Sequence, residues 1–218
     1  MALFHSPSIV RNGLVMFFDG INSKSYTGIS NTWQDLSGQN NNAAPTGSIS
    51  TTSTTGAYIL NGTSQYATVS NNFVTTATYS KSIWFNCTSF ATSNNLLSGN
   101  TIFWLAGSNQ VRAADTSNGN YNLASSVSTL TTNTWYHAGM TYNNLGVTTA
   151  TWKIYINGVL DSVTYAATSP SLGGIQVGAF GSGNFFTGSL ACPMIYNRVL
   201  SDSEMNQTFQ AHRDRFGI

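Results

Sequence analysis

The stretch WKIYINGVLDSV, residues 152–163, constrains the fold more than any other part of this 218-residue sequence. Its first five residues alternate, so that a tryptophan and two isoleucines share one face of a strand and a lysine and a tyrosine share the other. Asn157 and Gly158 then supply the two residues with positive φ that a type I′ turn requires. The sequence therefore predicts an antiparallel β-hairpin whose return strand starts at Val159.

Similar short runs, rich in β-branched and aromatic residues, recur between clusters of glycine, asparagine, serine and threonine. Such runs are typical of strands bounded by turns. The expected strands lie near Leu14–Asp19, Ala57–Leu60, Tyr66–Val69, Ser82–Cys87, Ile102–Leu105, Val111–Ala114, Tyr121–Ala124, Trp135–Tyr142, Trp152–Ile156, Val159–Tyr165, Ile175–Gly178 and Gly188–Tyr196. Because no helical pattern separates them, they predict an all-β fold, a two-sheet antiparallel jelly-roll sandwich, in one domain.

Two segments are expected outside this sandwich. Residues 1–12 are expected to form an N-terminal arm, ahead of a domain at 13–218. The stretch Asn40–Gly56 is polar and of low complexity, and its low apolar content predicts a surface loop. Cys87 and Cys192 lie far apart in strand-like runs, which favours two free thiols and leaves a disulfide as the alternative.

The sequence contains a single glutamate, Glu204, near its end. Ser201 precedes it by three residues, which is the spacing of a capping box, where serine and glutamate each bond the other's backbone N–H. Met205, Phe209 and His212 follow at helical spacing, so that one face can lie on the sandwich. We therefore predict a short C-terminal helix and assign Ser201 and Glu204 structural roles in starting it.

Charge is scarce in this chain. Only 7% of the residues are charged, against about 25% in average domains, so serine, threonine and asparagine must keep the surface hydrated. The eight basic residues are scattered apart from Arg213 and Arg215, whereas phosphate binding needs clustered cations; we expect no nucleic-acid partner. No run approaches the roughly 20 apolar residues of a membrane helix, and the N-terminal residues do not form a signal-peptide pattern.

Catalysis is not expected from this set of side chains. Glycoside hydrolysis needs two carboxylates within about 5 to 10 Å, and no two aspartates share a predicted strand at positions i and i+2. The sequence has no G-x-S-x-G motif and no histidine or cysteine residues at metal-ligand spacing. Asp19 and Asp35 are the best candidates for a calcium ion, although turn capping is the favoured explanation of both. No cofactor is expected, with calcium as the open alternative.

Several segments resemble the laminin-G-like, concanavalin A-like jelly-roll superfamily, and the resemblance covers nearly the whole chain. They appear in that family's order: YILNGTSQYATV, TWYHAGMTYNN, KIYINGVLDSV, GGIQVGAF and FFTGSLACPMIYNRVLSDSEM. Family members often carry an acidic, calcium-binding residue where this chain has Gln65, so the resemblance lowers the expectation of calcium. In the closing strand, Cys192 and Met194 stand where relatives are often polar, and Pro193 lies between them. We expect a partner or a neighbouring subunit, in a possible homo-oligomer, to cover that face.

A narrower resemblance is to versions of this domain carried by tailed bacteriophages. It rests on three segments: SPSIVRNGLVMFFDGINSKSY, TWQDLSGQNNNAA and HRDRFGI. The resemblance implies a virion protein, made in the host cytoplasm without a signal peptide and placed on the virion surface.

The expected function is therefore that of a non-enzymatic structural protein of the virion, a capsid decoration protein that acts through contacts with other virion proteins. Leu3, Phe4, Ile9 and Val10 of the arm are apolar and suit such docking. The alternative is a carbohydrate-binding adhesin of a tail or fibre that recognises host surface glycans. Sugars stack on aromatic rings, and the candidates beside glycine- and asparagine-rich segments are Trp104, Tyr121, Phe180 and Phe185.

Overall fold

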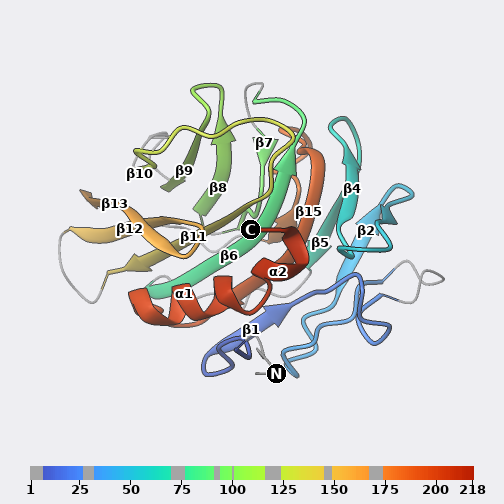
Figure 1. The fold of residues 1–218 in the computed structure, drawn as a ribbon, viewed down its shortest axis with the longest axis horizontal. Coiled ribbons are helices and arrows are strands. Elements are labelled where there is room, and N and C mark those ends of the chain that lie inside the picture. Colours follow the sequence, from blue (N-terminus) through green and yellow to red (C-terminus); the bar gives the residue numbers. More distant parts are fainter. Residues whose placement is uncertain are drawn as a thin grey trace, which may run out of the picture.

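The computed structural model describes residues 7–26, 32–69, 77–90, 94–99, 101–115, 124–144, 149–166 and 174–218. The described part is a β-sandwich with two short helices at its C-terminal end (Figure 1). The strands are β1 (Leu14–Phe17), β2 (Ala43–Thr46), β3 (Ser50–Thr51), β4 (Tyr58–Asn61), β5 (Tyr66–Val69), β6 (Thr78–Cys87), β7 (Asn94–Asn95), β8 (Thr101–Ala106), β9 (Gln110–Asp115), β10 (Ala124–Ser125), β11 (Tyr136–Asn143), β12 (Ala150–Ile156), β13 (Val159–Ala166), β14 (Ile175–Val177) and β15 (Thr187–Tyr196). The helices are α1 (Asp202–Gln210) and α2 (Arg213–Phe216).

One layer of the sandwich, here called the back sheet, is a single antiparallel sheet of eight strands in the order β13-β12-β11-β6-β15-β4-β3, with β1 also paired to β15. Strand β15 pairs with β6 along one edge, and along its other edge it pairs first with β4 and then with β1. The change of partner coincides with a bulge between Ala191 and Met194, where Cys192 has a φ of 48°. This bulge explains how Pro193, which has no N–H, is tolerated in a central strand.

The other layer, here called the front layer, consists of a four-stranded sheet, β10-β9-β8-β7, and a three-stranded sheet, β14-β5-β2. An isolated bridge between Leu97 and Val177 joins the two. The two-sheet expectation is thus refined, because one of the two layers is divided at a seam.

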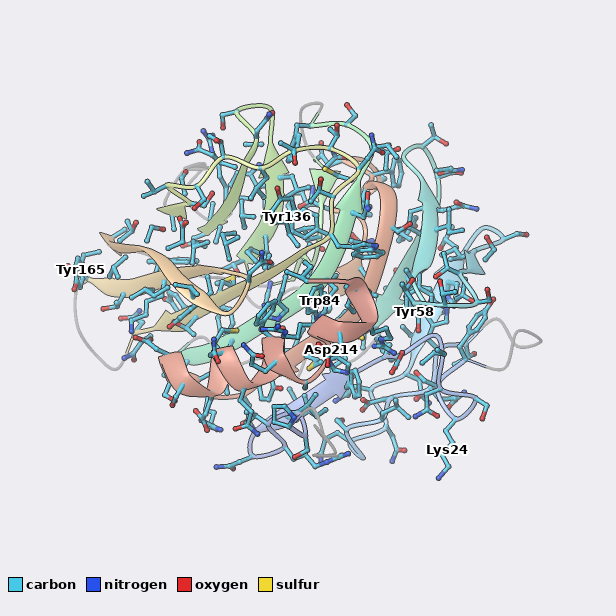
Figure 2. All side chains as sticks on the ribbon, viewed as in Figure 1. Lys24, Tyr58, Trp84, Tyr136, Tyr165 and Asp214 are labelled. Carbon is cyan, nitrogen blue, oxygen red and sulfur yellow. The ribbon has the colours of Figure 1, made fainter. Side chains whose placement is uncertain are left out.

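Side chains of both layers meet in the main core, which includes Trp152 and Tyr142 of the back sheet and Phe103 of the front layer. The outer side of the back sheet is also apolar, and there Trp84 and Tyr155 are buried beneath the C-terminal helices. Figure 1 shows α1 and α2 lying across β6, and Figure 2 shows Trp84 beside them.

Close contact between helix and sheet depends on glycine. A Cβ atom at Gly139 of β11 would lie 2.5 Å from Sδ of Met205 in α1. Gly158, in the β12–β13 turn, has a φ of 74°, and a Cβ there would lie 2.7 Å from Cβ of Phe209. Larger residues at either position would push α1 away from the back sheet.

The local predictions from turn and cap chemistry are confirmed. Asn157 and Gly158 both have positive φ, and Ile156 pairs with Val159 across the two-residue turn. Ser201 accepts the backbone N–H of Glu204 at 3.2 Å, and Glu204 accepts that of Ser201 at 2.9 Å. Helix α1 starts at Asp202, directly after Ser201, and a second short helix, α2, follows α1.

The stretch Asn40–Gly56 lies largely at the surface, as expected, but the prediction that it is a loop is wrong. This stretch contains β2 and β3, and two of its apolar side chains, Ala43 and Ile49, are buried in the main core. Strand β2 pairs with β5. Pairing with a strand far along the chain therefore gives this segment a regular structure that its composition does not predict. Of the expected strand Tyr121–Ala124, only Ala124 lies among the described residues, and it belongs to β10. Both cysteines are free and buried, as favoured.

Glu204 also binds Arg198 through two hydrogen bonds, of 2.6 and 2.8 Å, and this neighbour lowers the pKa of the carboxyl group to about 2. We expect Glu204→Gln to lower the free energy of unfolding at pH 7 by about 1 kcal/mol. The folded-state pKa lies below the unfolded value, so the wild-type advantage exists above about pH 4.5 and is lost as the pH falls towards 2. Urea denaturation at pH 7 and pH 3 measures both effects. Asp214→Asn, which removes an exposed carboxylate, is the matched control, and a pH-independent difference would contradict the ion-pair explanation.

Candidate functional site

The outer side of the front layer carries a group of apolar side chains that the main core does not use. Strand alternation turns Phe103 inward and leaves Ile102 and Trp104 on the outer side of β8. They pack with Ala114 of β9 and with partly exposed Phe180, which follows β14. Two of the expected glycan-binding residues, Trp104 and Phe180, therefore belong to one cluster, in which Phe180 is partly exposed and Trp104 is buried, at 9% exposed.

A second aromatic pair lies on the same layer. The rings of Tyr66 and Phe185 are 5.8 Å apart between centroids, at an angle of 33°. Both side chains are partly exposed, and Tyr66 lies on β5, next to β14. The loop after β14 carries Phe180 to the cluster that contains Trp104 and carries Phe185 to Tyr66, and it is closed by hydrogen bonds between Phe180 and Gly183. We call Tyr66, Trp104, Phe180 and Phe185 the aromatic face.

Uncharged polar groups and one cation accompany the aromatic face. Gln176 of β14 donates to the backbone carbonyl of Gly181 at 3.2 Å, so it supports the loop between the two phenylalanines. Thr68 lies opposite Gln176 on β5, and Arg112 lies opposite Trp104 on β9. Aromatic rings with a few directed polar groups are the usual components of a small-molecule binding surface. The sequence did not single out Tyr66, because its alternation in YATV is equally typical of a strand that packs on a core.

No carboxylate belongs to the aromatic face, although all seven lie among the described residues. Asp115 lies on β9 but is buried on the inner side, one position beyond Ala114. Asp161 caps the backbone N–H groups of Val127 and Ser128. Asp202 binds Lys153 at 2.7 Å. The arrangement offers contacts for binding and no pair of acids for hydrolysis at this surface.

The two candidate calcium ligands are occupied by hydrogen-bond donors. Asp35 accepts the backbone N–H groups of Phe17, Ser37 and Asn41 and the hydroxyl of Ser37, which is turn capping. Asp19 binds the guanidinium of Arg215 through both of its oxygens, at 2.9 and 3.0 Å. Neither carboxylate presents the several free oxygen atoms that calcium requires, so Asp19 and Asp35 do not fit the ligands of a calcium ion.

A histidine and a cysteine lie close to Asp19, but a cation already fills their centre. Asp19, Cys192 and His212 bring one ligand atom each within 4.8 Å of one another. Arg215 lies among them and donates to the cysteine sulfur as well as to the aspartate. Burial lowers the pKa of His212 to about 4. This cluster therefore fixes α2 to the back sheet.

A serine–histidine pair occurs beneath the helices, where no substrate reaches it. The hydroxyl of Ser82 and Nε2 of His137 are 2.7 Å apart, and both residues are buried. Burial lowers the pKa of His137 to about 3, so that it is neutral at physiological pH. The pair is a packing element of the back sheet.

Comparison with known proteins decides the family. The family model of the concanavalin A-like lectin/glucanases superfamily matches residues 61–206. The chain belongs to this superfamily. A comparison with curated protein sequences finds no match.

Solved structures share the concanavalin A-like fold at low sequence identity. Domain 4 of AbnA, an extracellular arabinanase from Geobacillus stearothermophilus solved with arabinotriose, is 17% identical, with a TM-score of 0.68 over 89% of this chain and 97% of that one. The binding domain of botulinum neurotoxin serotype D/C is 16% identical, with a TM-score of 0.69 over 92% of this chain and 52% of that one. Trypanosoma rangeli sialidase is 14% identical, with a TM-score of 0.65 over 94% of this chain and 34% of that one. The chain thus spans about half of the toxin domain and a third of the sialidase, and it has a lectin-like fold.

The prediction that residues of this concanavalin A-like domain contact a partner is wrong for four of them, because they pack inside the domain itself. Cys192 and Met194 are fully buried beneath the C-terminal helices, and Ile9 and Val10 belong to the same cluster. The chain's own helices and N-terminal segment thus cover the face for which we expected a partner. This contact joins segments almost 200 residues apart, which local patterns do not reveal. Leu3, Phe4 and Tyr121 lie outside the described residues.

A different part of the described surface is apolar and exposed. Strand β13 is an edge of the back sheet, and Val159, Val163 and Tyr165 on it are 63%, 40% and 70% exposed. Tyr165 projects away from the body of the protein (Figure 2). Exposed apolar side chains on an edge strand are a common feature of protein-contact surfaces.

Proposed function

We propose that this protein is a non-enzymatic glycan-binding protein and that the aromatic face is its binding surface. The observation that carries the proposal is the partly exposed ring pair of Tyr66 and Phe185, together with partly exposed Phe180, which packs against the buried cluster that contains Trp104 on the same layer. Aromatic rings bind the apolar faces of sugar rings, and neighbouring amides, hydroxyls and guanidinium groups bind their hydroxyls. A lectin-like fold supports the proposal, as does a neighbour of that fold solved with arabinotriose.

The test is a glycan array followed by calorimetric titration of the best ligand. Tyr66→Ala and Phe185→Ala each remove one partly exposed ring of the face, and we expect each to weaken binding about tenfold, the effect of losing one stacking contact. Tyr165→Ala removes an exposed ring from the distant β13 edge and serves as the control. Equal affinity of all three variants would contradict the assignment of the surface, and a wild type that binds no glycan would contradict the function.

The non-enzymatic part of the proposal rests on the lack of carboxylates on the aromatic face. We expect cell-envelope polysaccharide incubated with the purified protein to keep its chain length, measured by size-exclusion chromatography. Depolymerisation that co-purifies with the protein and survives Tyr66→Ala would place a reaction elsewhere on the chain and overturn this view.

A second candidate function is capsid decoration on the virion surface, through contacts with other virion proteins. The resemblance of the N-terminal and C-terminal segments to phage versions of the domain supports it, and the exposed apolar edge at β13 offers a contact surface. Both functions are compatible, because the β13 edge and the aromatic face lie on different layers. A density map of the source particle tests the location, and the double variant Val163→Ser with Tyr165→Ser is expected to reduce incorporation into particles.

A further inference from the structure

Lys81 is an uncommon feature of this core. It lies on β6 between Tyr79 and Ile83, which both belong to the main core, and strand alternation directs it inward with them. Its side chain is fully buried between the two layers. Lysine is almost never fully buried without partners, because transfer of an amine from water is unfavourable. Consistent with this penalty, burial lowers the pKa of Lys81 to about 7.

The partners of Lys81 are backbone carbonyl groups. Its amino nitrogen donates to the carbonyl oxygens of Thr101 at 2.7 Å, Leu97 at 3.2 Å and Ser98 at 3.3 Å. The side chain therefore crosses the sandwich from the back sheet and binds the inner side of the front layer. Three acceptors match the three donors of a lysine ammonium group.

These carbonyls lie at the seam of the front layer. Residues 96–98 connect its two sheets, since Ser98 donates its backbone N–H to Gln176 at 2.9 Å and Gly178 donates to Leu96 at 3.1 Å. Leu97 forms the bridge to Val177. At a division between two sheets, the regular ladder cannot satisfy every carbonyl, and Lys81 satisfies three of them from within.

The seam divides the aromatic face. Trp104 is on β8, on one side of the seam, whereas Phe180 and Phe185 are on the loop after β14, on the other side. The packing of Phe180 against the cluster that contains Trp104 therefore depends on how the two sheets are held together. Gln176, which accepts from Ser98 at the seam, also supports this loop through Gly181.

We propose that Lys81 is the positioning residue of the aromatic face, because its amino group holds the two sheets of the front layer together at the seam. The inference rests on the proposed glycan-binding function for its effect on ligand, but its structural part stands independently of any ligand. Lys81 itself touches no ligand, since it lies behind the face in the core.

The test compares Lys81→Met, which keeps an apolar stem of similar length but has no donor, with Lys24→Met. Lys24 is exposed and points away from the body of the protein (Figure 2), so it is the matched control. Amide hydrogen exchange measured by NMR is the first readout. We expect the Ser98 and Gly178 amides, which bond across the seam, to exchange about tenfold faster in Lys81→Met, while the Asn157 amide, which bonds to His137 in the back sheet at 2.8 Å, stays protected. The second readout is glycan affinity, which we expect to fall about tenfold.

Chemical rescue distinguishes hydrogen bonding by the Lys81 amino group across the seam, here called the clamp, from general packing of its side chain in the core. Lys81→Ala leaves space for the missing atoms, and n-propylammonium supplies them with the same donor group. We expect n-propylammonium to restore protection of Ser98 and Gly178, whereas tetramethylammonium, which has no N–H donor, does not. This variant also provides the readout if Lys81→Met fails to fold.

The outcomes separate the two proposals. The role of Lys81 would be overturned by unchanged exchange at Ser98 and Gly178 in Lys81→Met, by an equal acceleration at Asn157, or by rescue with both ammonium ions. A wild type without glycan affinity would overturn the proposed function and leave the exchange result to decide on the clamp. Loss of protection together with unaltered glycan affinity would show that the seam does not position the face.

Discussion

Replacing Phe216 by alanine is expected to lower the free energy of unfolding by about 3 to 5 kcal/mol, the range for removing a buried phenylalanine. Phe216 is 6% exposed, and its ring stacks on that of Trp84 with 4.2 Å between centroids. It also contacts Trp135, at 4.6 Å. Helix α2 has four residues and is too short to be stable alone, so it depends on Phe216, together with the bonds of Arg215, for its attachment to the back sheet.

Guanidinium chloride denaturation measures this effect. Ile218→Ala, two residues further on and 37% exposed, is the control and is expected to change the stability by less than about 0.5 kcal/mol. We also expect Phe216→Ala to expose Trp84, which a red shift of tryptophan fluorescence would report before global unfolding. A stability loss below about 1 kcal/mol would mean that the remaining contacts of α1 suffice to cover the face.

Stability is expected to rise with pH between 7 and 9, by about 2 to 3 kcal/mol in total. The pKa of Lys81 is about 7 in the folded protein and 10.5 as a reference. Between these values the unfolded chain binds more protons than the folded one, so the free energy of unfolding increases by about 1.4 kcal/mol per pH unit. The sign is opposite to that of an ion-paired lysine, whose folded-state pKa is raised.

The pH window follows from the other buried groups. His137 and His212 have lowered pKa values of about 3 and 4, so their contribution grows as the pH rises to 6.5 and is constant above it. Burial raises the pKa of Cys87 and Cys192, whose unfolded thiols ionise above about pH 9, which reduces stability there. The centroid of the Tyr79 ring lies 5.7 Å from Nζ of Lys81. Burial raises the pKa of the Tyr79 hydroxyl, so that Tyr79 stays neutral in this pH window.

Urea denaturation at half-unit intervals between pH 6.5 and 9 measures the effect. Lys81→Met should remove the rise, whereas Lys24→Met should retain it. A wild-type stability that is flat across this range would mean that the carbonyl partners of Lys81 offset its burial.

Features specified by a few neighbouring residues could be predicted from the sequence. The turn at Asn157 and Gly158 follows from backbone conformation, and the start of α1 follows from the reciprocal bonds of Ser201 and Glu204. Strand β2 could not be predicted, because Ala43–Thr46 is ordered by β5, more than 20 residues away. The family resemblance, by contrast, was confirmed over most of the chain.

The candidate site was predictable only in part. Trp104 and Phe180 were expected and do pack together, whereas Tyr66 was missed because its partner, Phe185, lies more than 100 residues later. Lys81 was missed for a related reason. A lysine in YSKSIWF ordinarily indicates the solvent side of a strand, and only the seam in the opposite layer provides carbonyl groups that make an inward position acceptable.

The place of β15 in the back sheet has a consequence during synthesis on the ribosome. This strand lies between β6 on one edge and β4 and β1 on the other, and it is the last strand in the chain. Until residues 187–196 have emerged, the other strands of the back sheet form three separate pieces, β13-β12-β11-β6, β4-β3 and β1, each with an unpaired edge. Such edges are prone to mispairing, and non-local sheets of this kind fold slowly. We therefore expect the nascent chain to complete its sandwich only after the closing strand has left the exit tunnel, with chaperones protecting it until then.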